Sequence, residues 1–309
     1  MNKLLLAGAA SLALSMGAAA AHAQSITTGF IGASYSDIDL GGSGANLYDL
    51  SGTVAFDVSD DVEVQLDGHA GSLDPNGAGS SSETLWGPTG HLFFDKGNYK
   101  AGVFLGYEDF GDTFGSGTTL TGYGVEGRLA ASDNLSVGAL AGWATVNIDG
   151  SPDLDLTTYK LDASLFSSDH LRWDLSAAHT RFEWGPFNGN ATTWALGGEY
   201  QLEDKPISFT FGIANTASDL AAGDNRTLSV GVRYTIGGSL KDRDRTSSPF
   251  AGLPFAFGGI GGLLAGQASV LQDFYNCFNE EGSCPNEDAI NEWVDGFDDF
   301  DCFFDECDQ

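Results

Sequence analysis

Apolar and polar residues alternate with a period of two along much of the chain. The alternation is clearest in residues 227–236, where every second position carries a large apolar side chain and the positions between are small, hydroxylated or charged. It recurs in residues 62–67, 99–108 and 159–165, where the polar positions include several full charges. Because successive side chains of a β-strand point to opposite faces, the pattern predicts strands with one apolar and one polar face.

Short turn signals divide these strands into a regular series of hairpins. The turns centre on residues 60, 96, 133, 169 and 204, so that successive centres are 36, 37, 36 and 35 residues apart. Longer segments rich in Gly, Ser, Asp and Asn lie between them, at 72–82, 109–118, 149–153 and 185–190. Each repeat is therefore expected to contain a strand, a long loop, a second strand and a tight turn.

The repeats predict an all-β fold, a closed antiparallel up-and-down transmembrane β-barrel of about twelve strands. Segments of about ten residues, with short turns at one end and long loops at the other, are typical of barrels in lipid. Aromatic residues are expected near the strand ends, at Tyr35, Trp86, Tyr99, Tyr107 and Trp143. A soluble β-sandwich would also alternate, and ten or fourteen strands are alternatives. The expected strands are 26–37, 46–58, 62–72, 83–95, 98–109, 118–131, 135–148, 155–167, 171–183, 191–202, 207–218 and 226–237.

The beginning of the chain has the pattern of a secretory signal peptide. Lys3 precedes an apolar run from Leu4 to Ala20, and an A-x-A cleavage site, Ala21-His22-Ala23, follows. A membrane anchor is the alternative interpretation, but the apolar run is short and no cationic stop sequence follows it. We therefore expect three regions: a signal peptide at 1–23, a β-barrel at 24–240 and a tail at 241–309.

With export, alternation and strand count established, residues 24–240 resemble the porin-like outer-membrane barrels of Gram-negative bacteria. The most specific element is the segment from Ser229 to Ile236, which is similar to the assembly signal of such barrels, with Gly231, Tyr234 and Ile236 at its key positions. In the family this signal usually ends the chain, whereas here about seventy residues follow. The resemblance implies an outer-membrane location, with membrane lipids and the barrel-assembly machinery as partners.

The polar face of the expected strands carries acids and bases that a barrel would direct into its lumen. Charges inside a barrel must be hydrated or paired. They therefore indicate either a water-filled path for polar solutes or a salt-bridge network that fills a narrow interior, and twelve strands are intermediate between these cases. The expected lumen-facing residues are Glu63, Asp67, Lys100, Glu108, Glu126, Arg128, Lys160, Asp162, Arg172, Asp174, Glu199 and Arg233.

Several other classes of function are disfavoured. A net charge of −30 argues against nucleic acid as a partner. Some outer-membrane barrels are lipid hydrolases, which place a Ser two residues after a His on one strand, and no His here has that arrangement. The sequence therefore predicts no enzymatic activity, no cofactor and no metal site. Residues 122–127 match the G-x-G-x-x-G motif, but a strand pattern runs through them and no helix follows.

The tail differs in composition from the barrel. Residues 246–309 hold thirteen acidic and no basic side chains, together with Cys277, Cys284, Cys302 and Cys307. In an exported chain, four cysteines predict two disulfides, and a four-cysteine zinc site is the alternative. Residues 286–297 are expected to form a short helix. Because both barrel ends should emerge in the periplasm, the tail is expected there as a cap, a plug or a docking element for a periplasmic partner.

Two functional hypotheses follow. The first is a narrow channel for small polar solutes with a mild cation preference, because residues 24–240 hold 28 acidic and 9 basic side chains, a net charge of −19. The second is a non-conducting scaffold or adaptor barrel whose disulfide-bonded tail binds a partner. The sequence names no solute and no oligomeric state.

The cysteine pattern generates the first prediction. The tail of purified, non-reduced protein should contain two internal disulfides, because its composition offers little apolar core and exported cysteines oxidise. Mass spectrometry after alkylation without reductant should find no alkylated cysteine. Four alkylated cysteines, or zinc in proportion to protein, would contradict this assignment.

Overall fold

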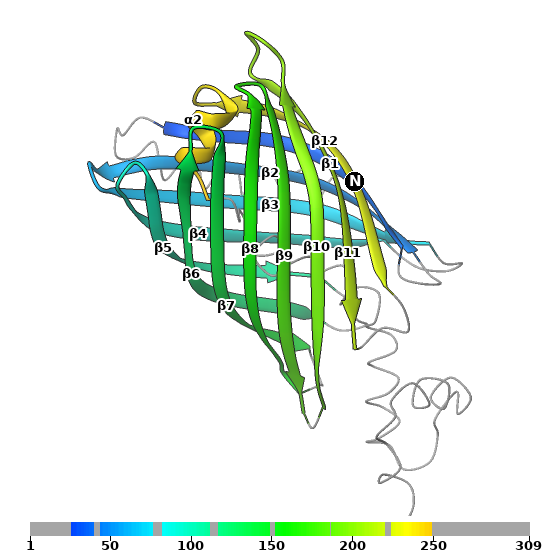
Figure 1. The fold of residues 1–309 in the computed structure, drawn as a ribbon. Helices are drawn as coiled ribbons and strands as arrows, with labels where there is room; N and C mark the ends of the chain where they lie inside the picture. Colours follow the sequence, from blue (N-terminus) through cyan, green and yellow to red (C-terminus); the bar gives the residue numbers. More distant parts are fainter. Residues whose placement is uncertain are drawn as a thin grey trace, which may run out of the picture.

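A computed structural model describes residues 26–39, 44–76, 82–111, 117–148, 152–185, 187–219 and 224–248. The expected signal peptide, the four cysteines and the expected helix at 286–297 lie outside the described residues. The described part is a single β-barrel with a short helix, α2 (Leu240–Arg245), at one end (Figure 1). No helix of this part is long and apolar enough to span a membrane.

Twelve antiparallel strands close into one barrel, which confirms the predicted fold and strand number. Each strand pairs with its neighbours in sequence, and β12 pairs with β1 to complete the ring. The strands are β1 (Ile26–Asp39), β2 (Gly44–Ser59), β3 (Val62–Pro75), β4 (Glu83–Asp95), β5 (Tyr99–Asp109), β6 (Thr118–Ser132), β7 (Leu135–Ile148), β8 (Leu154–Ser168), β9 (Leu171–Trp184), β10 (Phe187–Gln201), β11 (Ile207–Ser218) and β12 (Asn225–Ile236).

The β1–β12 seam depends on a glycine opposite an arginine. Gly32 of β1 is the register partner of Arg233 of β12. A Cβ atom at Gly32 would lie 2.8 Å from Cγ of Arg233, so any larger residue would displace the arginine side chain. The Arg233 guanidinium instead lies 4.3 Å from the centre of the Phe30 ring. The seam is thus closed by backbone pairing and by a cation–π contact.

One expected loop is shorter than the composition suggests. Residues 185–190 are rich in Gly and Asn, but β10 already begins at Phe187, and residues 187–190 pair with β9. Gly185 makes the turn with a φ of +57°. The expectation of a long loop here was therefore wrong, because glycine and asparagine in this hairpin continue the backbone ladder up to the turn.

The outer surface of the barrel is apolar. Large apolar side chains alternate along the strands with residues on the inner face, and most of them are about half exposed. Aromatic rings also lie on this surface: those of Tyr35 and Tyr48 are 5.3 Å apart, and those of Trp86 and Tyr107 are 5.8 Å apart. A monomeric soluble protein does not expose so continuous an apolar surface. The barrel is therefore built to span a membrane.

The register of β12 generates the second prediction. Val232 is 44% exposed on the apolar surface, and its neighbour Arg233 points inward. Val232→Arg should therefore lower the free energy of unfolding in lipid vesicles by about 2–4 kcal/mol, the cost of an arginine near mid-bilayer. Val58→Arg is the matched control, because Val58 is 49% exposed and close to the 60–61 turn, where the cost falls to about 0–1 kcal/mol. Equal losses of unfolding free energy for Val232→Arg and Val58→Arg in urea titrations would contradict this register.

Candidate channel lumen

The structure places all twelve expected lumen residues on the inner face of the barrel. Each alternates along its strand with residues of the apolar outer surface, as Arg233 does between Val232 and Tyr234. Most of them belong to two groups of contacts, one near the tight-turn end and one deeper in the lumen. Lys160 lies on the inner face of β8, two residues before Asp162.

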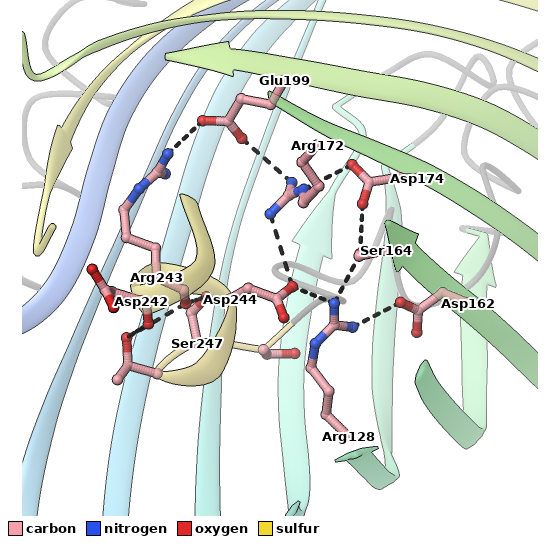
Figure 2. Close-up of polar contacts among 12 residues, drawn as sticks. Arg128, Asp162, Ser164, Arg172, Asp174, Glu199, Asp242, Arg243, Asp244 and Ser247 are labelled. Carbon is pink, nitrogen blue, oxygen red and sulfur yellow. Dashed lines mark hydrogen bonds and ion pairs between the residues drawn. The ribbon is translucent and has the colours of Figure 1, made fainter. Parts of the chain in front are cut away.

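Glu199 of β10 is the centre of the first group. Its carboxylate accepts hydrogen bonds from three guanidinium groups that belong to different elements: Arg172 at 3.3 Å, Arg233 at 3.1 Å and Arg243 at 2.8 Å. Glu199 is 1% exposed, so these three cations replace its hydration. Figure 2 shows two of these contacts, one from Arg243 of α2 to the barrel wall and one from Arg172 on the neighbouring strand β9.

Asp244 connects the same group to β6, farther along the barrel wall. It accepts a hydrogen bond from Arg128 of β6 and lies 4.0 Å from Arg172 of β9. Arg128 also donates to Asp162 at 2.7 Å and to Ser164 at 2.8 Å. Asp244 thus stands between an arginine of β6 and an arginine of β9, as Figure 2 shows. A second acid, Asp174, accepts from Arg172 at 3.0 Å and from Ser164 at 2.6 Å.

The segment that supplies Arg243 and Asp244 is the short helix α2 (Leu240–Arg245). Ser239 and Asp242 cap its N-terminus reciprocally, each accepting a hydrogen bond from the other's backbone N–H. The Leu240 side chain is fully buried, and Lys241 pairs with Asp169 of the β8–β9 turn at 3.3 Å. These contacts fix α2 across the tight-turn end of the lumen.

Sequence reasoning missed α2 and the two lumen ligands that it carries. A signal was present, because Ser239 followed three residues later by Asp242 is a capping-box pattern. The start of the tail therefore does more than stand at the mouth, since residues 243–248 enter the lumen.

A second group of contacts lies deeper in the lumen and includes two histidines. His91 lies 2.8 Å from Asp67 and 2.5 Å from Glu126, each carboxylate facing a different ring nitrogen. His69 is held in the same way between Asp49 at 3.1 Å and Glu108 at 2.7 Å. The His91 imidazole on β4 therefore connects β3 and β6, and the His69 imidazole on β3 connects β2 and β5.

Two further contacts complete the polar lumen. Lys100 pairs with Glu63 at 2.8 Å, and both side chains are buried. At the end of the described chain, the Ser248 backbone N–H donates to Gln65 at 2.6 Å, and its hydroxyl donates to Glu126 at 2.7 Å. Ser248 is therefore bound to the lumen wall on β3 and β6.

Apolar side chains fill much of the lumen toward the long-loop end. This apolar cluster comes from nine of the twelve strands and was not expected, because the sequence assigned apolar residues to the lipid face alone. It occupies the side of the lumen formed mainly by β3–β9. Its members are Ile38, Ala45, Leu73, Leu85, Phe104, Phe110, Leu120, Leu140, Ala144, Val146, Ile148, Leu154, Leu156, Phe182 and Trp184.

The other side of the lumen is lined by small side chains that remain partly accessible to solvent. We call this surface the small-residue lane. It runs along the inner face from β9 through β12 to β1 and β2, opposite the filled side. Its residues are Ser34, Ser36, Asp49, Ser51, Asp174, Ser176, Thr193, Ala195, Gly197, Thr210, Gly212, Ala214, Thr227, Ser229 and Gly231.

The expected assembly-signal residues divide between the two faces of β12. Tyr234 and Ile236 are exposed on the apolar surface, and Gly231 lies in the small-residue lane. A Cβ atom at Gly231 would lie 2.7 Å from the Thr210 hydroxyl, so a larger residue would crowd the neighbouring strand. Over the described part of the chain, no three His, Cys, Asp or Glu side chains are arranged to hold a metal ion.

A charged lumen inside an apolar outer surface defines a membrane-spanning β-barrel with the fold of the porin-like outer-membrane proteins. Solved structures of such proteins match it at low sequence identity. An outer-membrane channel from Pseudomonas putida F1 is 11% identical, with a TM-score of 0.52 over 68% of this chain and 95% of that chain. The translocator domain of the autotransporter NalP from Neisseria meningitidis is 14% identical, with a TM-score of 0.45 over 73% and 96%.

The similarity is limited to structure. A scan against protein-family models found no match, and a search of curated proteins found none either. The match to the Pseudomonas putida channel supports the barrel fold alone.

The Glu199 group generates the third prediction. Glu199→Gln removes the one carboxylate that three arginines share, and it takes away the acidic partner of Arg233 and Arg243, whereas Arg172 keeps Asp174. It should lower the free energy of unfolding by about 3–5 kcal/mol, as expected for a broken buried ion pair. Glu183→Gln is the control, because Glu183 pairs with Arg181 at 3.0 Å on the exposed surface, where a pair contributes at most about 1 kcal/mol. Equal losses of unfolding free energy for the two variants, measured by urea titration in vesicles, would contradict this account.

Proposed function

We propose that this protein is an outer-membrane barrel that forms a narrow channel for small polar solutes. The small-residue lane is the observation that supports this proposal most directly. Its hydroxyl groups, glycines and alanines leave room along one wall, while larger side chains fill the opposite side. A twelve-stranded barrel with one filled side would pass small solutes only along the other side.

The charges along the lane support a mild cation preference. Its two ionisable residues are acids, Asp49 and Asp174, and the barrel as a whole has a net charge of −19 over residues 24–240. A lumen with negative potential between low-dielectric walls raises the local concentration of cations. Arg172 and His69 balance part of this charge, so the preference is proposed to be modest.

The proposed role is not enzymatic. Each lumen histidine already has a carboxylate at both ring nitrogens, which leaves no nitrogen to accept a proton from a serine hydroxyl. Hydroxyl activation by a histidine requires that free nitrogen. The proposal therefore assigns these histidines to the positioning of the lumen wall.

A non-conducting scaffold is the second candidate, and the α2 contacts favour it. Arg243 and Asp244 tie the helix to strands on several sides of the lumen, which is the arrangement expected of a permanent plug. In that case the barrel would anchor the tail and its partner. Conductance separates the two candidates, because only the channel passes ions.

Cysteine modification in the lane supplies the fourth prediction. Ser229→Cys should place a thiol in the path, so a charged, water-soluble methanethiosulfonate reagent should reduce the single-channel conductance in a planar bilayer severalfold. The reagent adds a bulky cation to a wall of small residues, where it blocks space and repels cations.

Val230→Cys is the matched control for this experiment. Val230 is adjacent in sequence but is 58% exposed on the apolar surface, so its thiol should leave the current unchanged. Wild-type protein treated with the same reagent shows how much of any change in conductance comes from the native cysteines. Equal block at both positions, or none at Ser229→Cys, would reject the lane as the path.

A further inference from the structure

We propose that residues 249–272 run through the lumen along the small-residue lane and that the acidic, cysteine-containing residues 273–309 emerge at the long-loop end of the barrel. Residues 273–309 would then lie at the cell surface rather than in the periplasm. This inference goes beyond the proposed channel, because it concerns where the chain itself goes and holds whether or not the lane conducts.

The direction of the chain between α2 and Ser248 is the first argument. Arg245 donates to the backbone carbonyl of Asp133, which lies in the tight turn between β6 and β7. Ser248, three residues after Arg245, donates to Glu126, which lies on β6 seven residues before Asp133. Ser248 also donates to Gln65 on β3. Ser248 is also buried. At Ser248, the last described residue, the chain therefore runs inward, away from the tight-turn end.

The length of the remaining chain is the second argument. On β3, ten residues separate Gln65 from Pro75 at the long-loop end, about 33 Å at about 3.3 Å per residue. Residues 249–272 span at most about 80 Å when fully extended. They can therefore cross the rest of the lumen with length to spare, and residues 273–309 are then free to lie beyond it.

The composition of that segment is the third argument. No charged side chain occurs between Arg245 and Asp273, and residues 250–266 contain six glycines. An uncharged segment can pass beside the apolar cluster without burying a charge, and glycines allow its backbone to approach the wall closely. All thirteen acids of the tail begin at Asp273, beyond the length needed for the crossing.

The lumen offers a matching surface for this segment. The apolar cluster, including Phe104, Leu140 and Phe182, faces the small-residue lane across the outer part of the lumen. An apolar, glycine-rich strand of this same chain fits between the two better than a charged or bulky one. The alternative path is a reversal of the chain after Ser248. It is less favourable, because it would bring an apolar segment back past Glu199 and the arginines that surround it.

The fifth prediction tests the position of the tail in intact cells. A short epitope appended after Gln309 should bind antibody at the cell surface about as strongly as the same epitope inserted in loop 112–116. The same epitope at Asp133, in a tight turn, should bind only after the cells are opened. A C-terminal epitope that behaves like the Asp133 insertion would overturn the proposal.

Disulfide cross-linking tests the path through the lane. With the four tail cysteines replaced by serine, Gly259→Cys should cross-link to Ser229→Cys under mild oxidation but not to Val230→Cys on the outer face. A heat-dependent gel shift confirms that each variant is a folded barrel. A folded protein without the Ser229→Cys cross-link, or with equal cross-linking at both positions, would overturn the proposal even if the channel conducts.

Discussion

Closure of β12 on β1 is the constraint on which the rest of the structure depends. In hydrocarbon an unpaired backbone N–H or C=O has no water to bond, so a sheet can span a membrane only as a ring. Eleven register pairs form this seam, and Gly32 leaves room within it for the Arg233 side chain. Once the ring is closed, the apolar face of every strand points to lipid, and the lumen must accommodate all the remaining side chains.

The lumen meets that requirement in two different ways. Toward the tight-turn end, acids and bases compensate each other, with Glu199 shared among three arginines and Asp244 placed between two. Toward the long-loop end, apolar side chains fill one side and small residues line the other. Because Arg243 and Asp244 belong to α2, part of this compensation comes from the segment after the barrel. Residues 243–248, at the start of the tail, are therefore a structural component of the lumen.

Sequence reasoning could predict the barrel but only half of the lumen. Period-two alternation and the turn spacing identified the twelve strands, because each is a local pattern. The inward charges, such as Glu126 and Arg128, followed from the same alternation. Their partners did not, since the curvature of the barrel brings His91 to Glu126, and the segment after α2 brings Ser248 there. The apolar cluster was missed because an inward Leu140 and an outward Leu161 look alike in the sequence.

The central claim is that the small-residue lane passes ions, and planar-bilayer recording tests it most directly. The intact chain should be compared with a chain that ends at Ser248, which keeps α2 and its ion pairs but lacks residues 249–309. We expect discrete, cation-preferring current steps from both proteins, with the larger steps from the shortened one. If both proteins are folded barrels by heat-dependent gel shift and neither passes current, the lane is not a path and the channel account is wrong.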